Sequence, residues 1–245
     1  MIPKRIELFE SKDLLSIYPV KSKNKLDISC FNNKGQMGNF IVPELFDALL
    51  KLDKLVRLNK GTMYIIDLYR SWECQAEARE KFENKTKRAF VSKPGESFHN
   101  AGRAADISMK DLNFEEINKD KWVSMFWDLA KPLGFYPIIT IPDLGASEVW
   151  HYDFPGNSWQ DAYNVLQYSE VAKCCTLDIG GWDLNENEEK VRKMFIQSQL
   201  IRLGFYEIGK VDGIIGPKTQ KVLDFCNVGE FDTKVIADML SHRDP

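Results

Sequence analysis

The stretch SFHNAGRAADIS, residues 97–108, carries a serine, a histidine, a glycine and an aspartate at fixed intervals within one short segment. His99 is one of only three histidines in a chain of 245 residues. Neutral imidazole and carboxylate groups are common zinc ligands. Gly102, which lies among small alanines, allows the chain to bend sharply between His99 and Asp106. The segment therefore predicts two metal ligands that converge.

A second segment, SEVWHYDF at residues 147–154, supplies a third ligand. A catalytic zinc ion needs three protein ligands and one open position, and His151 completes the set. Glu148, three residues earlier, is a candidate base. Residues three apart face opposite sides of a regular strand, so Glu148 must lie at a loop end or a bulge if it is to face the same site as His151.

Single histidines are weak evidence for a metal site, because a lone histidine on a strand is more often a core or surface residue. Here two of the three histidines lie beside acidic residues in glycine-bearing segments. The third, His242, lies in the C-terminal tail and is expected to be solvated. Asp153 is expected at the surface, with a role as a partner behind a metal ligand as the alternative. Asp67 is expected either to support the site or to have a paired structural role.

Composition narrows the class of protein. The net charge of −3 gives no basic footprint for nucleic acid or an anionic membrane, and 44% hydrophobic residues suffice for a core. No apolar run is long enough to span a membrane. The five cysteines are odd in number and indicate no secreted disulfide framework. The N-terminus shows no secretory signal, so we expect synthesis in the cytoplasm.

The hydrophobic pattern predicts an α+β fold, in which helices flank a small and mostly antiparallel sheet. A helix is expected from residue 43, another from Ser71, a third over 120–134 and a fourth near 160–173. Strands are expected at 63–68, 103–109, 135–140 and 149–154. The predicted domains are a catalytic domain at 1–173, a linker at 174–186 and a three-helix domain at 187–245, with helices near 187–203, 217–226 and 232–241.

Together the two motifs, S-x-H-x-x-G-x-A-x-D and E-x-W-H, resemble those of the zinc D-alanyl-D-alanine peptidases, which include vancomycin-resistance enzymes and phage endolysins. The matching residues are Ser97, His99, Gly102, Ala104, Asp106, Glu148, Trp150 and His151. The segment YRSWECQ, residues 69–75, resembles the upstream part of the family, with Arg70 and Gln75 as the matching residues.

The resemblance implies one Zn²⁺ per chain, bound by His99, Asp106 and His151. It implies that Glu148 transfers the proton between water and the leaving amine, and that Arg70 stabilises the oxyanion. An arginine suits that task because it is always protonated and can bind two oxygens at once. Ser97, Gln75 and Trp150 are expected to support the metal shell or to line the substrate pocket.

The C-terminal region resembles the three-helix peptidoglycan-binding domain that is often attached to wall hydrolases. The resemblance rests on Ile196, Gln197, Leu200, Leu203, Gly204, Asp212, Gly213, Gly216, Thr219, Val222 and Phe225. Gln197, Asp212, Gly213 and Thr219 are the expected wall-binding residues. Cys226 departs from the family, which usually has glutamine there. The alternative is a helical module that caps the enzyme or binds a protein.

The resulting hypothesis is a monomeric zinc peptidase that hydrolyses peptidoglycan stem peptides at D-alanine, as a carboxypeptidase or an endopeptidase, and degrades the wall. One alternative is an endolysin that cuts the L-alanyl-D-glutamate bond. Another is a catalytically dead wall-binding protein, which the complete set of motif residues disfavours. The expected partner is peptidoglycan, without nucleic acid or a membrane span. The protein is expected to reach the wall through a holin-type pore or as an injected effector.

Overall fold

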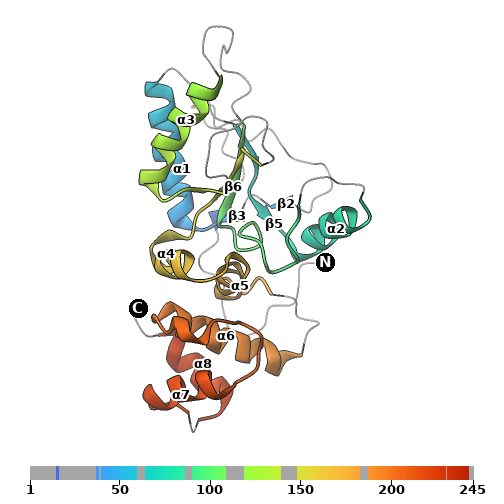
Figure 1. Cartoon of the computed structure of the whole chain (residues 1–245), viewed down its shortest axis with the longest axis vertical. Coiled ribbons are helices and arrows are strands. Elements are labelled where there is room, and N and C mark those ends of the chain that lie inside the picture. The colour runs from blue at the N-terminus through green and yellow to red at the C-terminus, as the bar shows by residue number, and fades with distance from the viewer. Residues whose placement is uncertain are drawn as a thin grey trace.

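The computed structural model describes residues 15–16, 37–38, 40–59, 64–85, 90–108, 119–138, 148–182, 187–229 and 231–242. Within these ranges a small sheet with flanking helices is followed by a group of C-terminal helices (Figure 1). The α+β class predicted from the sequence is confirmed. No helix in the described ranges is both long and apolar enough to cross a membrane.

The central sheet holds four short strands in the order β4-β6-β8-β7, and each neighbouring pair is antiparallel. The strands are Tyr64–Asp67 (β4), Ala104–Ser108 (β6), Tyr136–Pro137 (β7) and His151–Asp153 (β8). Two further antiparallel pairs join Leu15–Ser16 (β1) to Phe40–Ile41 (β3) and Met37–Gly38 (β2) to Tyr69–Arg70 (β5). The two motif segments thus lie on adjacent strands, β6 and β8.

Two helices form one hydrophobic core with the sheet. Helix α1 spans Pro43–Leu58, and helix α3 spans Lys119–Ala130 and continues as a 3₁₀ turn at Lys131–Leu133 (η1). They lie side by side in Figure 1. The apolar face predicted for the first helix is buried in this core, which contains Leu45, Leu49, Leu52, Val56, Ile65, Ile107, Phe126, Trp127 and Tyr152.

Helix α2, Trp72–Glu83, begins where the sequence predicts, because the Ser71 hydroxyl caps it by accepting a hydrogen bond from the Cys74 amide at 3.3 Å. Its sequence is mostly charged, and Gln75 is its one buried residue. This helix therefore contributes little to the core. It holds a buried amide next to Arg70, the last residue of β5.

The region after β8 differs from the prediction. Instead of one helix near 160–173, it forms Gly156–Val165 (α4) and Tyr168–Asp178 (α5). The linker predicted at 174–186 begins too early, because α5 continues to Asp178. Cys174 and Cys175 are fully buried and fill the core as small apolar residues. The turn residues that favour a linker begin only with the glycines at 180 and 181.

The C-terminal helices are Glu188–Arg202 (α6), Pro217–Phe225 (α7) and Thr233–Ser241 (α8), with a 3₁₀ turn at Tyr206–Ile208 (η2). Their positions confirm the three predicted helical stretches. They share one core cluster with α4, α5 and the segment before β6, which includes Phe98, Ala104, Trp159, Cys175, Ile196, Leu200 and Leu240. In Figure 1, α4 and α5 lie between the sheet and the C-terminal helices.

Candidate metal centre and active site

His99, Asp106 and His151 converge in the folded chain. Asp106 and His151 are register partners on β6 and β8, and His99 lies in the turn before β6. The Asp106 Oδ1 atom lies 2.9 Å from His151 Nδ1 and 3.2 Å from His99 Nε2, and the two nitrogens are 3.1 Å apart. All three residues are buried, so they form a compact set of donor atoms beneath the surface.

Hydrogen bonds outside this triangle determine which ring nitrogens face inward. His99 Nδ1 lies within hydrogen-bond distance of the Leu68 carbonyl oxygen. A carbonyl only accepts, so Nδ1 carries the proton and the lone pair is on Nε2. His151 Nε2 lies 2.9 Å from Asp153 Oδ1. The other ring nitrogen of His151, Nδ1, is therefore the one that faces the centre of the triangle and can bind a metal. Such partners on the far nitrogen are typical of metal-binding histidines.

The spacing of the donor atoms fits zinc. In a tetrahedral zinc site with bonds of about 2.0–2.1 Å, neighbouring ligand atoms lie about 3.3 Å apart. The observed separations are 2.9–3.2 Å. Two imidazoles and one carboxylate match the donor set of a catalytic zinc ion and leave the fourth position for water or substrate. The residues present therefore fit the metal that the motifs imply.

The electrostatics of the triangle also favour a cation. Burial would raise the pKa of Asp106, but the two histidines hold the pKa well below its usual value. Burial would lower the pKa of His151, but Asp153 and Asp106 outweigh it and raise the pKa to about 10. Without metal, Asp106 is thus ionised and His151 protonated at neutral pH. A bound cation takes the place of that proton.

The turn that carries His99 is held by its own polar groups. Gly102 has φ +61°, a conformation that favours glycine. The Ser97 hydroxyl accepts a hydrogen bond from the His99 amide at 3.3 Å. Asn100 donates from its side chain to the Arg70 carbonyl at 2.7 Å and accepts from the Gly95 amide at 3.1 Å. Ser97 thus supports the loop.

Arg70 is held beside the metal centre by two partners. Its Nε and Nη2 atoms donate to Asp67 Oδ2, the first at 3.2 Å, and Nη1 donates to Gln75 Oε1 at 2.9 Å. Gln75 is anchored in turn by a 2.7 Å bond from Nε2 to the Ser92 carbonyl. Asp67 is the register partner of Asp106. The structure thus shows Asp67 in a paired role, with Arg70 as its partner.

Glu148 lies in a turn over residues 148–150 and not in the strand. Its φ is +67°, and its carbonyl accepts a hydrogen bond from the His151 amide at 3.0 Å. This break in the strand is what the alternation argument requires for Glu148 and His151 to serve one site. A positive φ at a non-glycine residue is uncommon and concentrates at functional sites. Trp150, in the same turn, is 38% exposed.

Asp153 corrects a sequence-based expectation. It was expected at the surface, but it is fully buried and accepts a hydrogen bond from His151 Nε2. It also accepts one from the Tyr163 hydroxyl at 2.9 Å. The available signal was the period of two along a strand, which puts residues 151 and 153 on one face. The alternative role, as a partner behind a metal ligand, is therefore the one that the hydrogen bond from His151 supports.

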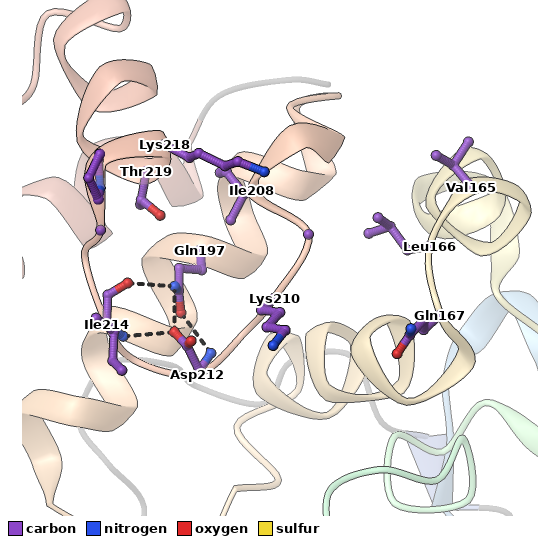
Figure 2. A pocket seen from close by; sticks show the side chains of 13 residues that line it. Val165, Leu166, Gln167, Gln197, Ile208, Lys210, Asp212, Ile214, Lys218 and Thr219 are labelled. Atoms are coloured by element: carbon purple, nitrogen blue, oxygen red, sulfur yellow. Dashed lines mark hydrogen bonds between the residues drawn. The ribbon is translucent and has the colours of Figure 1, made fainter.

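The predicted wall-binding residues Gln197 and Asp212 use their polar atoms within the fold. Gln197 donates to Asp212 Oδ1 and to the Ile214 carbonyl, each at 3.0 Å, and accepts from the Asp212 and Gly213 amides at 3.0 and 2.8 Å. Figure 2 shows the bonds among Gln197, Asp212 and Ile214. Gly213 has φ +78°, so its role is conformational. The polar atoms of Gln197 and the backbone conformation of Gly213 thus serve the fold of this loop.

Gln197 and Asp212 also line a groove of about 760 Å³. One wall comes from the turn between α4 and α5, with Val165, Leu166 and Gln167 (Figure 2). The other wall comes from the C-terminal unit and includes Gln197, Ile208, Lys210, Asp212, Ile214, Lys218 and Thr219. The groove thus spans the boundary between the two parts of the chain.

Comparison with known proteins identifies the part of the chain that holds the metal centre. Residues 39–157 match the family model VanY, D-alanyl-D-alanine carboxypeptidase. This part of the chain belongs to the VanY family. The match includes His99, Asp106, Glu148 and His151, whereas α5 and the C-terminal helices lie outside it. No curated protein matches the chain.

Three solved structures are similar to parts of this chain. VanYB in complex with D-alanine-D-alanine is 19% identical with a TM-score of 0.38, covering 59% of this chain and 86% of its own. The LD-carboxypeptidase LdcB is 29% identical with a TM-score of 0.44, covering 66% and 78%. A mutant of the vancomycin resistance D,D-pentapeptidase VanY in complex with Zn(II) is 19% identical with a TM-score of 0.38, covering 64% and 92%.

Proposed function

We propose that the protein is a zinc-dependent peptidase that hydrolyses the stem peptides of peptidoglycan at D-alanine. The observation that carries the proposal is the convergence of one donor atom each from His99, Asp106 and His151 within 4.8 Å, in a segment that belongs to the VanY family. The D-alanine substrate follows from the description of that family.

The side chains around the centre divide the chemistry among them. Bound zinc supplies an electrophile that acidifies water and polarises a carbonyl oxygen. Glu148, in the turn next to His151, is the base that removes a proton from water and returns it to the leaving amine. Its position outside the strand supports this role.

Arg70 stabilises the negative charge that develops on the carbonyl oxygen of the scissile bond. A fixed cation whose guanidinium is already oriented by Asp67 and Gln75 needs no reorganisation during the reaction. Its side chain is 16% exposed, so it retains access to a ligand. Trp150, exposed in the turn beside the centre, supplies an apolar surface for the substrate.

The C-terminal helices bring the peptidase to polymeric wall. Support comes from the resemblance of this region to peptidoglycan-binding domains and from the groove that runs beside Thr219. Binding a second part of the same polymer would raise the effective concentration of stem peptides at the metal centre. A pull-down with purified sacculi tests this role separately from catalysis.

Mass spectrometry of defined muropeptides tests the reaction. Loss of a terminal D-alanine, or opening of a D-alanine cross-link, that is blocked by a chelator and restored by zinc is the expected result. Cleavage after L-alanine would replace the proposal with an L-alanyl-D-glutamate endopeptidase. No product from any muropeptide or sacculus, with zinc bound, would refute the catalytic proposal and favour a wall-binding protein.

Glu148→Gln separates catalysis from metal binding. The variant is expected to keep zinc and to lose about 10²–10⁴-fold in kcat, because the loss of a general acid–base residue has that effect. Glu83→Gln is a matched control, since this glutamate lies at the surface on α2 and pairs with Arg79. Equal activity of Glu148→Gln and the parent protein would remove Glu148 from the mechanism.

A further inference from the structure

The carboxylate of Asp153 is surrounded by donors from three elements. It accepts from His151 Nε2 on its own strand at 2.9 Å. It accepts from the Tyr163 hydroxyl on α4 at 2.9 Å and from the Tyr168 hydroxyl on α5 at 3.4 Å. Asp153 has no exposed surface. A buried carboxylate persists as an anion only when donors replace its water, so the two tyrosines are part of what keeps Asp153 in place.

The same two tyrosines also contact the segment that carries the other histidine ligand. The rings of Tyr163 and Tyr168 lie 5.5 and 5.3 Å from the ring of Phe98, between centroids. Phe98 is fully buried and immediately precedes His99. The tyrosine hydroxyls therefore lie behind one metal ligand, and the tyrosine rings lie behind another.

We propose that Tyr163 and Tyr168 are positioning residues for the metal centre. Their hydroxyls hold the Asp153 carboxylate, which fixes the ring of His151 so that Nδ1 faces the metal. Their rings hold Phe98, and with it the turn of His99. This inference rests on the proposed zinc site. Neither tyrosine belongs to the cluster of metal-donor residues, and both lie beyond the segment that matches the family model.

The tyrosines are donors throughout the neutral range. Burial and the nearby Asp153 raise the pKa of Tyr163 and Tyr168 well above the usual value of 10. A protonated hydroxyl that faces a carboxylate donates its hydrogen bond, and such charge-assisted bonds are the stronger ones. The hydroxyls of Tyr163 and Tyr168 therefore remain the donors, and the Asp153 carboxylate the acceptor, as the pH varies around neutrality.

The helix that carries Tyr168 is itself fixed by the C-terminal unit. Glu170, on the first turn of α5, accepts a hydrogen bond from the Val211 amide at 2.7 Å. At the other end, Gln199 of α6 donates to Asp178 at 3.4 Å. Contacts from the C-terminal region thus reach the metal centre through α5, Tyr168 and Asp153.

Zinc affinity of the full-length protein, measured by competition with a chromogenic chelator, tests the proposal. Loss of a partner behind a metal ligand typically weakens binding about 10–100-fold, and we expect this for the Tyr163→Phe/Tyr168→Phe double variant. Tyr152→Phe is the matched control. Tyr152 lies between His151 and Asp153 on β8, but its ring packs into the other core, against Phe126 and Phe135. The zinc affinity of the Tyr152→Phe variant is expected to equal that of the parent protein.

A double-mutant cycle separates positioning from general packing. If Tyr163 acts through Asp153, Tyr163→Phe lowers zinc affinity in the parent protein but has no further effect in the Asp153→Asn background. Equal effects in both backgrounds, or a double tyrosine variant within threefold of the parent, would overturn the proposal. A parent protein that binds no zinc would instead refute the proposed function. Thermal melting of each single variant without metal is the control that tests whether the fold is kept.

Discussion

Zinc binding to this protein should release a proton from His151 at every pH below about 10. In the metal-free protein both ring nitrogens face carboxylates, with Nδ1 2.9 Å from Asp106 and Nε2 2.9 Å from Asp153. These neighbours outweigh the effect of burial and raise the pKa of His151 to about 10. The lone pair of Nδ1 that would bind zinc therefore carries a proton at neutral pH.

The pKa of His151 determines how strongly the apparent zinc affinity depends on pH. Each unit of pH below 10 costs a factor of ten in apparent zinc affinity, or about 1.4 kcal/mol. At pH 7 the loss is about a thousandfold, or about 4 kcal/mol. Isothermal titration calorimetry at pH 6.0, in two buffers of different ionisation enthalpy, should report about one proton released per zinc ion. Zinc lowers the pKa of bound water to about 7. At pH 6.0 that water therefore stays largely protonated and does not add to the count of released protons.

Asp153→Asn is the informative variant, because it removes the first of the two carboxylates that raise the pKa of His151. Its metal-free His151 should deprotonate at lower pH, so fewer protons should be released at pH 8 than in the parent protein. The reasoning would be refuted if the zinc affinity of the parent protein were constant between pH 6 and 8 and the binding enthalpy did not depend on the buffer.

Three further predictions concern stability. Gly156→Ala should destabilise the fold by about 1–3 kcal/mol, because Gly156 has φ +67° and a Cβ there would lie 2.6 Å from Arg103 Nη1, next to the Glu44 carboxylate; unchanged thermal melting would contradict it. Gln197→Ala should cost about 2–4 kcal/mol in urea unfolding, because four hydrogen bonds are lost; a loss below about 1 kcal/mol would contradict the structural role. The metal-free protein should lose stability as pH rises from 6.5 to 10, since the raised pKa of His151 stabilises the fold fully below 6.5 and no longer above about 10; stability rising over that range in chelator would contradict it.

The sequence was most informative where spacing along the chain translates directly into space. His99, Asp106 and His151 could be chosen because residue types and intervals restrict which side chains can meet. The α1 helix followed from its apolar repeat, and the position of Glu148 outside a strand followed from the alternation of side chains. In each case a local rule of backbone geometry was sufficient.

The prediction failed where packing between distant segments decides. Aspartate is a residue type that usually lies at the surface, and Asp153 is buried because α4 and α5 pack against it. The linker was expected to begin at residue 174, but α5 runs through the adjacent cysteines at 174 and 175, whose side chains pack in the core shared with the C-terminal helices. The structural role of Gln197 likewise depends on a loop that follows it by 15 residues or more. None of these contacts is encoded in a short window.

The shared core of α5 and α6 determines how an anchor at the C-terminal end would act. A flexible tether lets a bound enzyme sweep through many positions, whereas a rigid connection permits simultaneous engagement at one geometry only. Under the proposed wall binding, the groove and the metal centre are held at a fixed distance from each other. Stem peptides at the matching interval along a strand would be cut, and those at other intervals would be passed over until the protein dissociates and rebinds.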